Sequence, residues 1–149
     1  RNKDAKTFTA KFFRYQRSQP IFKNLQYKKI INLQKKIDLK KEEILFYKKN
    51  KILEGSTTNI ICVKKNRMFI PKDSYYYGIT LSYLLEKSNY SFQKKEIYLE
   101  SLSEFTELLL VGSGKGVVSI SSIKKLNWYR SSMKIYEHLL SKYSRVLLQ

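Results

Sequence analysis

Residues 52–63, ILEGSTTNIICV, predict a strand, a polar turn and a second strand. The first strand is a short apolar stretch that ends at Glu54. The second is the β-branched run that opens at Asn59, which favours extended structure. A carboxylate, a serine, two threonines and an asparagine fall within the six residues 54–59. We therefore take this turn as the place around which the rest of the chain is organised.

A hairpin and a helix follow this pair of strands. Residues 64–67, KKNR, are a predicted turn before a short return strand that ends at Pro71. Gly78 then opens a helical pattern that continues with Ile79 and Thr80. The first turn of a helix offers backbone N–H groups without an intrahelical partner and the positive end of the helix dipole, and together these bind phosphate groups well.

The order of these pieces resembles the class IV aminotransferases, which are fold type IV enzymes that use pyridoxal 5'-phosphate (PLP). Their pattern of Glu-Gly-x-x-x-Asn, a hairpin, a proline and Gly-Ile-Thr appears here as EGSTTN at 54–59, Pro71 and GIT at 78–80. The segment 23–27, KNLQY, is similar to the segment that carries the family's cofactor lysine. Lys23 precedes Glu54 by 54 − 23 = 31 residues, close to the separation in the family.

The resemblance implies PLP as the cofactor and gives roles to several residues. Lys23 would hold the aldehyde of PLP covalently, and its amine would act as the catalytic base that moves the Cα proton. Glu54 would face the pyridine nitrogen and keep it protonated. The N–H groups of Ile79 and Thr80 would bind the phosphate, together with the hydroxyl of Ser113 in a Gly-rich loop. The remaining implied cofactor contacts are Tyr27, Thr58 and Asn59, for which a helix-core role or a turn-closing role is also open.

Helical and strand patterns alternate along the rest of the chain and predict an α/β fold. The resemblance implies a mixed sheet or pseudo-barrel with flanking helices, like the C-terminal domain of the family. The further predicted strands are 5–15, 42–47, 92–99, 108–111 and 117–120, and the predicted helices are 24–41, 79–86, 101–104 and 129–148. We expect one cofactor-binding domain at 1–149. Nothing in the chain corresponds to the family's N-terminal domain, and the chain opens with Arg1 rather than Met, so we expect a fragment of a longer protein.

Composition favours a folded protein and leaves one alternative from another functional class. Of the 149 residues, 42% are hydrophobic and 14% are aromatic, which is more than disordered chains carry. The formal net charge of +18 allows a basic nucleic-acid-binding domain. The lysines, however, are spread along the whole chain and outnumber the arginines, whereas base recognition usually favours arginine. We therefore do not expect nucleic acid as a partner.

The sequence also limits the metal sites and the location that we expect. One cysteine and one histidine cannot build a four-ligand zinc site, so no metal is expected. Cys62 is predicted to be a buried strand thiol, and His138 a solvated helix residue. No apolar run approaches the roughly 20 residues that span a bilayer, and no signal peptide is visible. We expect a cytoplasmic enzyme with a small-molecule substrate, and the resemblance implies a homodimer.

Within the family the sequence is most like aminodeoxychorismate lyase, which makes 4-aminobenzoate and pyruvate from 4-amino-4-deoxychorismate. Branched-chain enzymes typically carry extra glycines after the cofactor lysine, whereas KNLQY is the shorter form that lyase and D-amino-acid members share. Leu81 also stands where many members have an arginine. A branched-chain or D-amino-acid aminotransferase is the alternative, and a truncated, inactive product is a third possibility.

Overall fold

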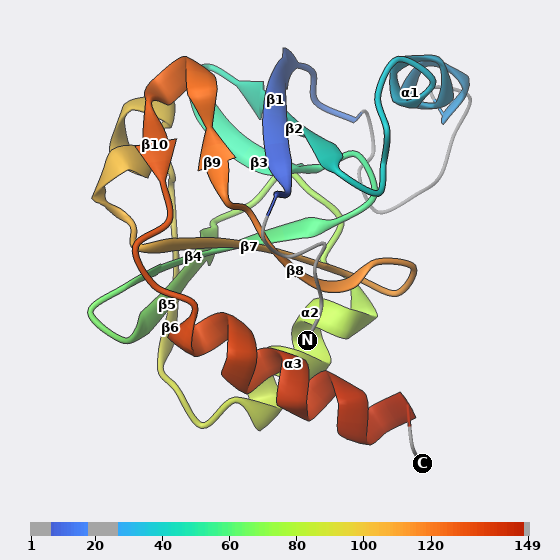
Figure 1. The fold of residues 1–149 in the computed structure, drawn as a ribbon. Helices are drawn as coiled ribbons and strands as arrows, with labels where there is room; N and C mark the ends of the chain where they lie inside the picture. The colour runs from blue at the N-terminus through green and yellow to red at the C-terminus, as the bar shows by residue number, and fades with distance from the viewer. Residues whose placement is uncertain (1–6, 18–26, 148–149) are drawn as a thin grey trace.

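The computed structural model describes residues 7–17 and 27–147, and residues 1–6, 18–26 and 148–149 lie outside it (Figure 1). The elements of the described part follow in the order β1 (Thr9–Arg14), α1 (Tyr27–Gln34), β2 (Glu42–Lys48), β3 (Lys51–Gly55), β4 (Asn59–Lys64), β5 (Arg67–Pro71), α2 (Ile79–Lys87), β6 (Phe92–Lys95), the 3-10 helix η2 (Leu99–Glu104), β7 (Glu107–Gly112), β8 (Gly116–Ser119), β9 (Ser122–Ile123), the 3-10 helix η3 (Lys124–Leu126), β10 (Trp128–Tyr129) and α3 (Lys134–Leu147).

The strands form two mixed five-stranded sheets. The first has the order β10-β9-β1-β2-β3, with β1 parallel to β2, and the second has the order β6-β5-β4-β7-β8, with β6 parallel to β5. Two hairpins turn on pairs of residues with positive φ, Lys49 with Asn50 and Lys65 with Asn66. Positive φ at both central residues suits the right-handed twist of the flanking strands, which fixes the register of each hairpin.

The turn at 55–58 carries the chain from the first sheet to the second. β3 ends before it in the first sheet, and β4 begins after it in the second. β4 lies in the middle of its sheet and is buried on both faces. Ile60 and Cys62 face the core between the sheets, whereas Ile61 and Val63 face the helices. A strand covered on both faces needs a continuous apolar run, which explains the sequence IICV.

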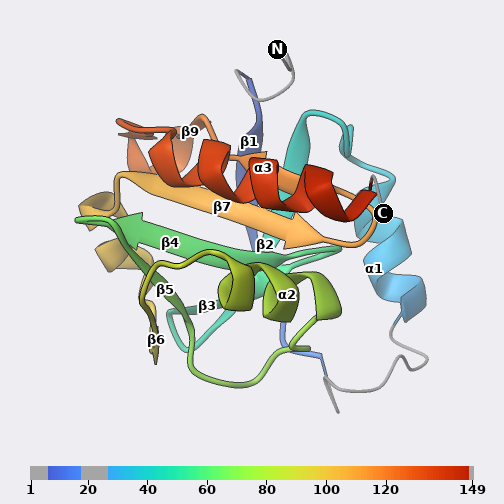
Figure 2. The same cartoon turned by 90° about the horizontal axis from the view of Figure 1, so that it is seen from below.

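Helices cover the outer faces of both sheets. α2 and α3 pack on the second sheet, through Leu81 and Leu84 of α2 and Ile135 of α3 (Figure 2). α1 packs Ile30 against Phe46 on the outer face of the first sheet. The structure therefore confirms the predicted α/β class with mixed sheets and flanking helices. No helix in the described ranges is long and apolar enough to cross a membrane.

The observed helix boundaries correct two predictions. The helix predicted at 24–41 ends at Gln34 within the described residues. The chain turns after it, where the N–H of Ile37 donates to the carbonyl of Gln34 at 3.2 Å, and turns again where Asp38 Oδ1 accepts from the N–H of Lys40 at 3.0 Å. The helix predicted at 129–148 begins only at Lys134. Glu107 lies at its start, and its carboxyl group accepts the N–H groups of Ile135 at 3.0 Å and Tyr136 at 2.9 Å.

The strand boundaries agree closely with the predictions around the 55–58 turn and less well elsewhere. The predicted strand at 92–99 is only four residues long, and the chain turns into η2 from Leu99. The residues just before α3 are extended rather than helical, because Trp128 and Tyr129 pair with Ile123 and Ser122 as β10.

Candidate functional site

Three strand ends meet at one edge of the second sheet. β4 runs antiparallel to both β5 and β7, with Asn59 opposite Val111, so the start of β4 lies beside the ends of its two neighbours. The turn 55–58 leads into this edge, and the segment 72–78 leaves it to begin α2. Figure 2 shows the tip of β7 and one end of α2 on the same side of the molecule. The predicted site residues in this part of the chain therefore belong to one edge.

Glu54 is a buried acidic residue at this edge and is only 4% exposed. Its Oε2 accepts a hydrogen bond from Nε of Arg17 at 2.9 Å, and the backbone of Tyr76 lies close enough to the carboxylate to act against the rise of its pKa. Burial raises the pKa of Glu54, while the charge and the hydrogen bond of Arg17 act against that rise. The structure thus places the Glu54 carboxylate in a buried environment, where it can pair with a cation or a protonated ring nitrogen.

Asn59 ties the segment before α2 to the start of β4. Its Nδ2 donates to the carbonyl of Tyr76 at 2.7 Å, and its Oδ1 accepts the N–H of Gly78 at 3.1 Å. A Cβ at position 78 would lie 2.8 Å from that same Oδ1, so this close approach requires glycine. Tyr76 contacts both Glu54 and Asn59, and the start of α2 is therefore fixed relative to the buried carboxylate.

The N-terminus of α2 is open for an anion. Gly78 has extended backbone and supplies no side-chain cap. The N–H groups of Ile79 and Thr80 belong to the first helical turn and have no partner within the helix. They carry the positive end of the helix dipole, which favours a phosphate group. The side chain of Ile79 is 83% exposed, so bulk on that residue does not close the helix end.

Ser113 lies in the loop between β7 and β8, at the same edge. Gly112, the residue before it, approaches the turn closely: a Cβ there would lie 2.9 Å from the carbonyl oxygen of Thr57. Ser113 is exposed, and Tyr143 Oη donates to its carbonyl oxygen at 3.4 Å. The structure therefore places this hydroxyl-bearing loop beside the turn 55–58, at the sheet edge from which α2 begins.

Glu43 was not predicted as a site residue, yet it organises the turn. It is wholly buried at the start of β2. Its carboxyl oxygens accept from the hydroxyl groups of Ser56, Thr57 and Thr58, and from the backbone N–H of Thr57 at 3.1 Å. Thr58, which was predicted near the cofactor, thus closes the turn with its hydroxyl. The sequence alone does not single out Glu43, because Glu42 beside it is the same residue type.

Lys23, the predicted catalytic lysine, lies outside the described residues. Tyr27 is the first residue of α1, and only its backbone is described. The helix that follows Lys23 does reach the turn, since Gln34 Nε2 donates to Ser56 Oγ at 3.1 Å. Glu54, Thr58, Asn59, Ile79, Thr80 and Ser113 are thus brought to one edge, and the places of Lys23 and of the Tyr27 side chain stay predictions.

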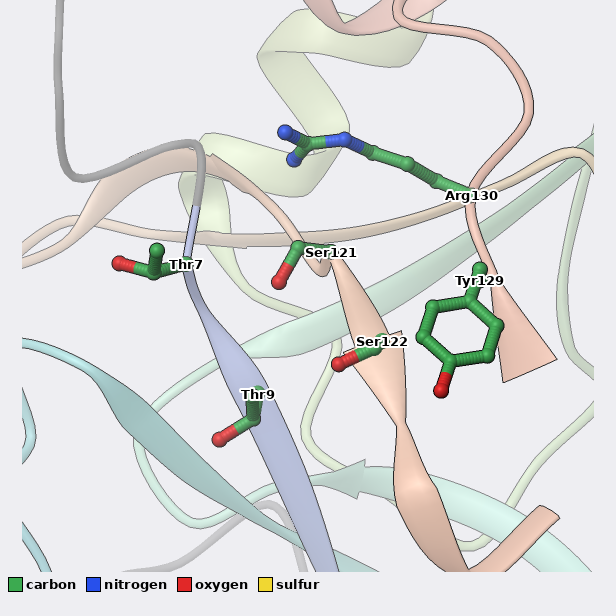
Figure 3. Close-up of a pocket in the computed structure, with 6 residues that line it drawn as sticks. All are labelled: Thr7, Thr9, Ser121, Ser122, Tyr129 and Arg130. Carbon is green, nitrogen blue, oxygen red and sulfur yellow. The ribbon is translucent and has the colours of Figure 1, made fainter. Parts of the chain in front are cut away.

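A pocket of about 460 Å³ lies elsewhere, where β1, β9 and β10 adjoin (Figure 3). It is lined by Thr7, Thr9, Ser121, Ser122, Tyr129 and Arg130. None of the predicted site residues lines it. Its polar groups also serve the fold, since Ser121 Oγ donates to the carbonyl of Phe8 at 2.8 Å.

The family of the chain is shown by its sequence. The family described as amino-transferase class IV matches residues 2–123, which is most of the sequence. The chain belongs to this family. The class IV match covers both the predicted lysine segment and the turn 54–59, and it ends before α3. No curated protein sequence matches the chain.

Solved structures of class IV aminotransferases and similar proteins share the fold. A hypothetical aminotransferase from Mycobacterium tuberculosis in a PLP-bound form has a TM-score of 0.78 and 13% identity, over 94% of this chain and 56% of that one. A branched-chain aminotransferase from Thermoproteus uzoniensis with norvaline has a TM-score of 0.78 and 20% identity, over 99% and 54%. A candidate 4-amino-4-deoxychorismate lyase from Legionella pneumophila has a TM-score of 0.75 and 18% identity, over 91% and 56%.

The chain therefore spans little more than half the length of each of these three proteins. At such identities the similarity establishes the fold of this class IV family member. The alternative of a basic nucleic-acid-binding domain is not favoured, because the family match and the fold together account for most of the chain.

Proposed function

We propose that this chain is the cofactor-binding part of a PLP-dependent class IV enzyme. The observation that carries the proposal is that a buried carboxylate, Glu54, and an uncapped helix start at Ile79 lie at one edge and are joined through Tyr76. PLP has a basic ring nitrogen at one end and a phosphate at the other. The two groups of this edge are the complements of those two ends.

The residues present fit the cofactor. Glu54 would bind the ring nitrogen, and the N–H groups of Ile79 and Thr80 would bind the phosphate. Gly78 and Gly112 keep the backbone close to Asn59 and Thr57, where a Cβ would not fit. The other proposed contacts are Lys23 at the aldehyde, Tyr27 at the ring hydroxyl, Ser113 at the phosphate, and Thr58 and Asn59 as the residues that shape the turn.

Each residue would then have a defined task. When bound, PLP supplies the electron sink that lets a bond at the Cα of an amino substrate break. Glu54 would hold a proton at the ring nitrogen, because the negative charge of a buried carboxylate favours the protonated form of the ring. Lys23 Nζ would accept the Cα proton of the substrate and return it, which needs an amine that is partly unprotonated at neutral pH.

Residues outside this chain would complete the enzyme. Since the chain spans only part of the length of the similar structures, we propose that 1–149 is one cofactor-binding domain and that substrate-side groups come from a further domain of a longer protein. A cytoplasmic homodimer, as the family resemblance implies, is part of this proposal. Size-exclusion chromatography with light scattering on the full-length protein tests the dimer.

Capture of the cofactor on Lys23 tests the core of the proposal. The full-length protein incubated with PLP and reduced with borohydride should carry one pyridoxyl adduct, and peptide mapping should place it on Lys23. Lys23→Arg should abolish the adduct, whereas Lys29→Arg, an exposed neighbour on α1, should keep it. An adduct that maps to Lys28 or Lys29 instead would contradict the assignment of Lys23.

We further propose lyase rather than aminotransferase activity, on the short segment KNLQY and on Leu81 after Gly-Ile-Thr. With 4-amino-4-deoxychorismate and no keto acid, the full-length enzyme should release 4-aminobenzoate and pyruvate in equal amounts. The fold shared with a branched-chain aminotransferase supports the second candidate. No product from aminodeoxychorismate, together with transfer of an amino group from an amino acid to 2-oxoglutarate, would reverse this ranking.

A further inference from the structure

Arg17 is held at the site by three contacts. Its Nε donates to Oε2 of Glu54 at 2.9 Å, and its Nη2 donates to the carbonyl oxygen of Ser56 at 2.9 Å. Its guanidinium lies 5.6 Å from the centre of the Phe46 ring. A planar guanidinium with donors fixed in a fork can make such a set of contacts, and a lysine ammonium cannot. Arg17 therefore connects the segment after β1 to both the end of β3 and the turn 55–58.

The contact with Glu54 is not a surface ion pair. The side chain of Glu54 is 5% exposed and that of Arg17 is 19% exposed, so water screens the pair weakly. The bond engages one carboxyl oxygen of Glu54, Oε2, and so restricts the rotation of the carboxylate. A carboxylate that is both oriented and compensated in charge is ready for a ligand before the ligand arrives.

Burial and a neighbouring acidic residue act against the ionisation of Glu54. Glu43 is a second acidic residue whose charge acts on Glu54, and the charge of Glu54 in turn raises the pKa of the hydroxyl groups of Tyr15 and Tyr75. Burial is the largest cause that raises the pKa of Glu54, and Glu43 raises it further. Arg17 is the positive side chain that opposes both effects. Without this arginine, a proton shared between Glu54 and a ring nitrogen would move toward the carboxyl group.

We propose that Arg17 is a positioning residue that orients the Glu54 carboxylate and keeps it ionised, so that the cofactor's ring nitrogen holds the shared proton. This inference rests on the proposed function, because it concerns a PLP ring bound at Glu54. It adds a residue that touches neither substrate nor cofactor and acts only through Glu54 and the turn.

The first arm of the test uses the protein without cofactor. Urea unfolding of wild type, Arg17→Met, Glu54→Gln and the double variant forms a double-mutant cycle. We expect Arg17→Met to lower the unfolding midpoint clearly in the wild-type background and much less in the Glu54→Gln background, because the buried carboxylate is then absent. Arg14→Met, an exposed arginine at the end of β1, is the matched control and should leave the midpoint unchanged. Additive effects would overturn the pairing.

The second arm reads the ring nitrogen directly. With PLP labelled with ¹⁵N in the ring, the wild-type nitrogen should resonate as a protonated pyridine at pH 7, and in Arg17→Met it should shift toward the unprotonated value. The dissociation constant for PLP, measured by absorbance, should rise about 10-fold, as for other partners that orient a ligating side chain. Arg17→Lys should restore part of the ring protonation, because lysine returns the positive charge without the planar set of donors. If Arg17→Met does not fold, Arg17→Lys takes its place in the test.

The outcomes separate this inference from the proposed function. If wild type and Arg17→Met bind PLP equally, with a protonated ring in both, the role of Arg17 is overturned while the proposed function stands. If wild type does not bind PLP although the cycle shows strong coupling, the proposed function fails, and the role of Arg17 toward the ring fails with it. Loss of ring protonation in Arg17→Met alone, with Arg14→Met unchanged, supports the inference.

Discussion

Replacing Glu43 by alanine is expected to lower the free energy of unfolding by about 3 kcal/mol or more, since one buried acceptor serves several donors. Glu43 is wholly buried, and the hydroxyl groups of Ser56, Thr57 and Thr58 all donate to it. Its loss leaves the buried hydroxyl groups of Ser56 and Thr58 without this acceptor in a place that water reaches poorly. Urea or thermal denaturation followed by circular dichroism measures the change.

Two further variants make the Glu43 experiment specific. Glu86→Ala removes an exposed glutamate from α2 and should change the stability by less than about 0.5 kcal/mol. Glu43→Gln keeps the size of the side chain but turns an amide NH₂ toward hydroxyl donors, so we expect a loss between those of the other two variants. A change below about 1 kcal/mol for Glu43→Ala would show that the turn finds other acceptors and that Glu43 does not organise it.

Replacing Glu54 by glutamine is expected to lower kcat of the full-length enzyme about 100-fold, the order of magnitude for removal of one preorganised electrostatic partner. An amide cannot carry the charge that keeps the ring nitrogen protonated, and the cofactor then withdraws electrons less well. The fold should persist, because the amide oxygen can still accept from Arg17. Steady-state kinetics, with circular dichroism as the check of folding, provides the measurement.

The control for this variant is Glu137→Gln, which changes an exposed glutamate of α3 and should leave kcat within about twofold. The ring nitrogen of bound PLP should also lose its proton in Glu54→Gln, a change that ¹⁵N spectroscopy detects independently of turnover. Near-normal turnover in a folded Glu54→Gln protein would mean that Glu54 does not face the ring nitrogen.

The central part of the fold could be predicted from the sequence because its signals are local. The run Ile60 to Val63 is apolar on both strand faces, and the two hairpins turn at Asn50 and Asn66, a residue type that accepts positive φ. Helix ends were predicted less well. The chain turns after Gln34 and again at Asp38, and Glu107, far away in the chain, accepts N–H groups at the start of α3. A cap supplied from a distant strand leaves no periodic pattern in the helix itself.

The residues of the candidate site also fall into those with a local sequence signal and those brought in from distant parts of the chain. The family pattern of Glu54, Asn59 and Gly78 is visible in the sequence, since these residues belong to short motifs with fixed spacing. The side chains that surround them are seen only in the folded chain. Arg17 lies 54 − 17 = 37 residues before Glu54, and Glu43 reaches the turn because β2 pairs with β3. Strand pairing brings such charges together, and one charged residue among 30 basic and 12 acidic ones carries no mark of its partner in the sequence.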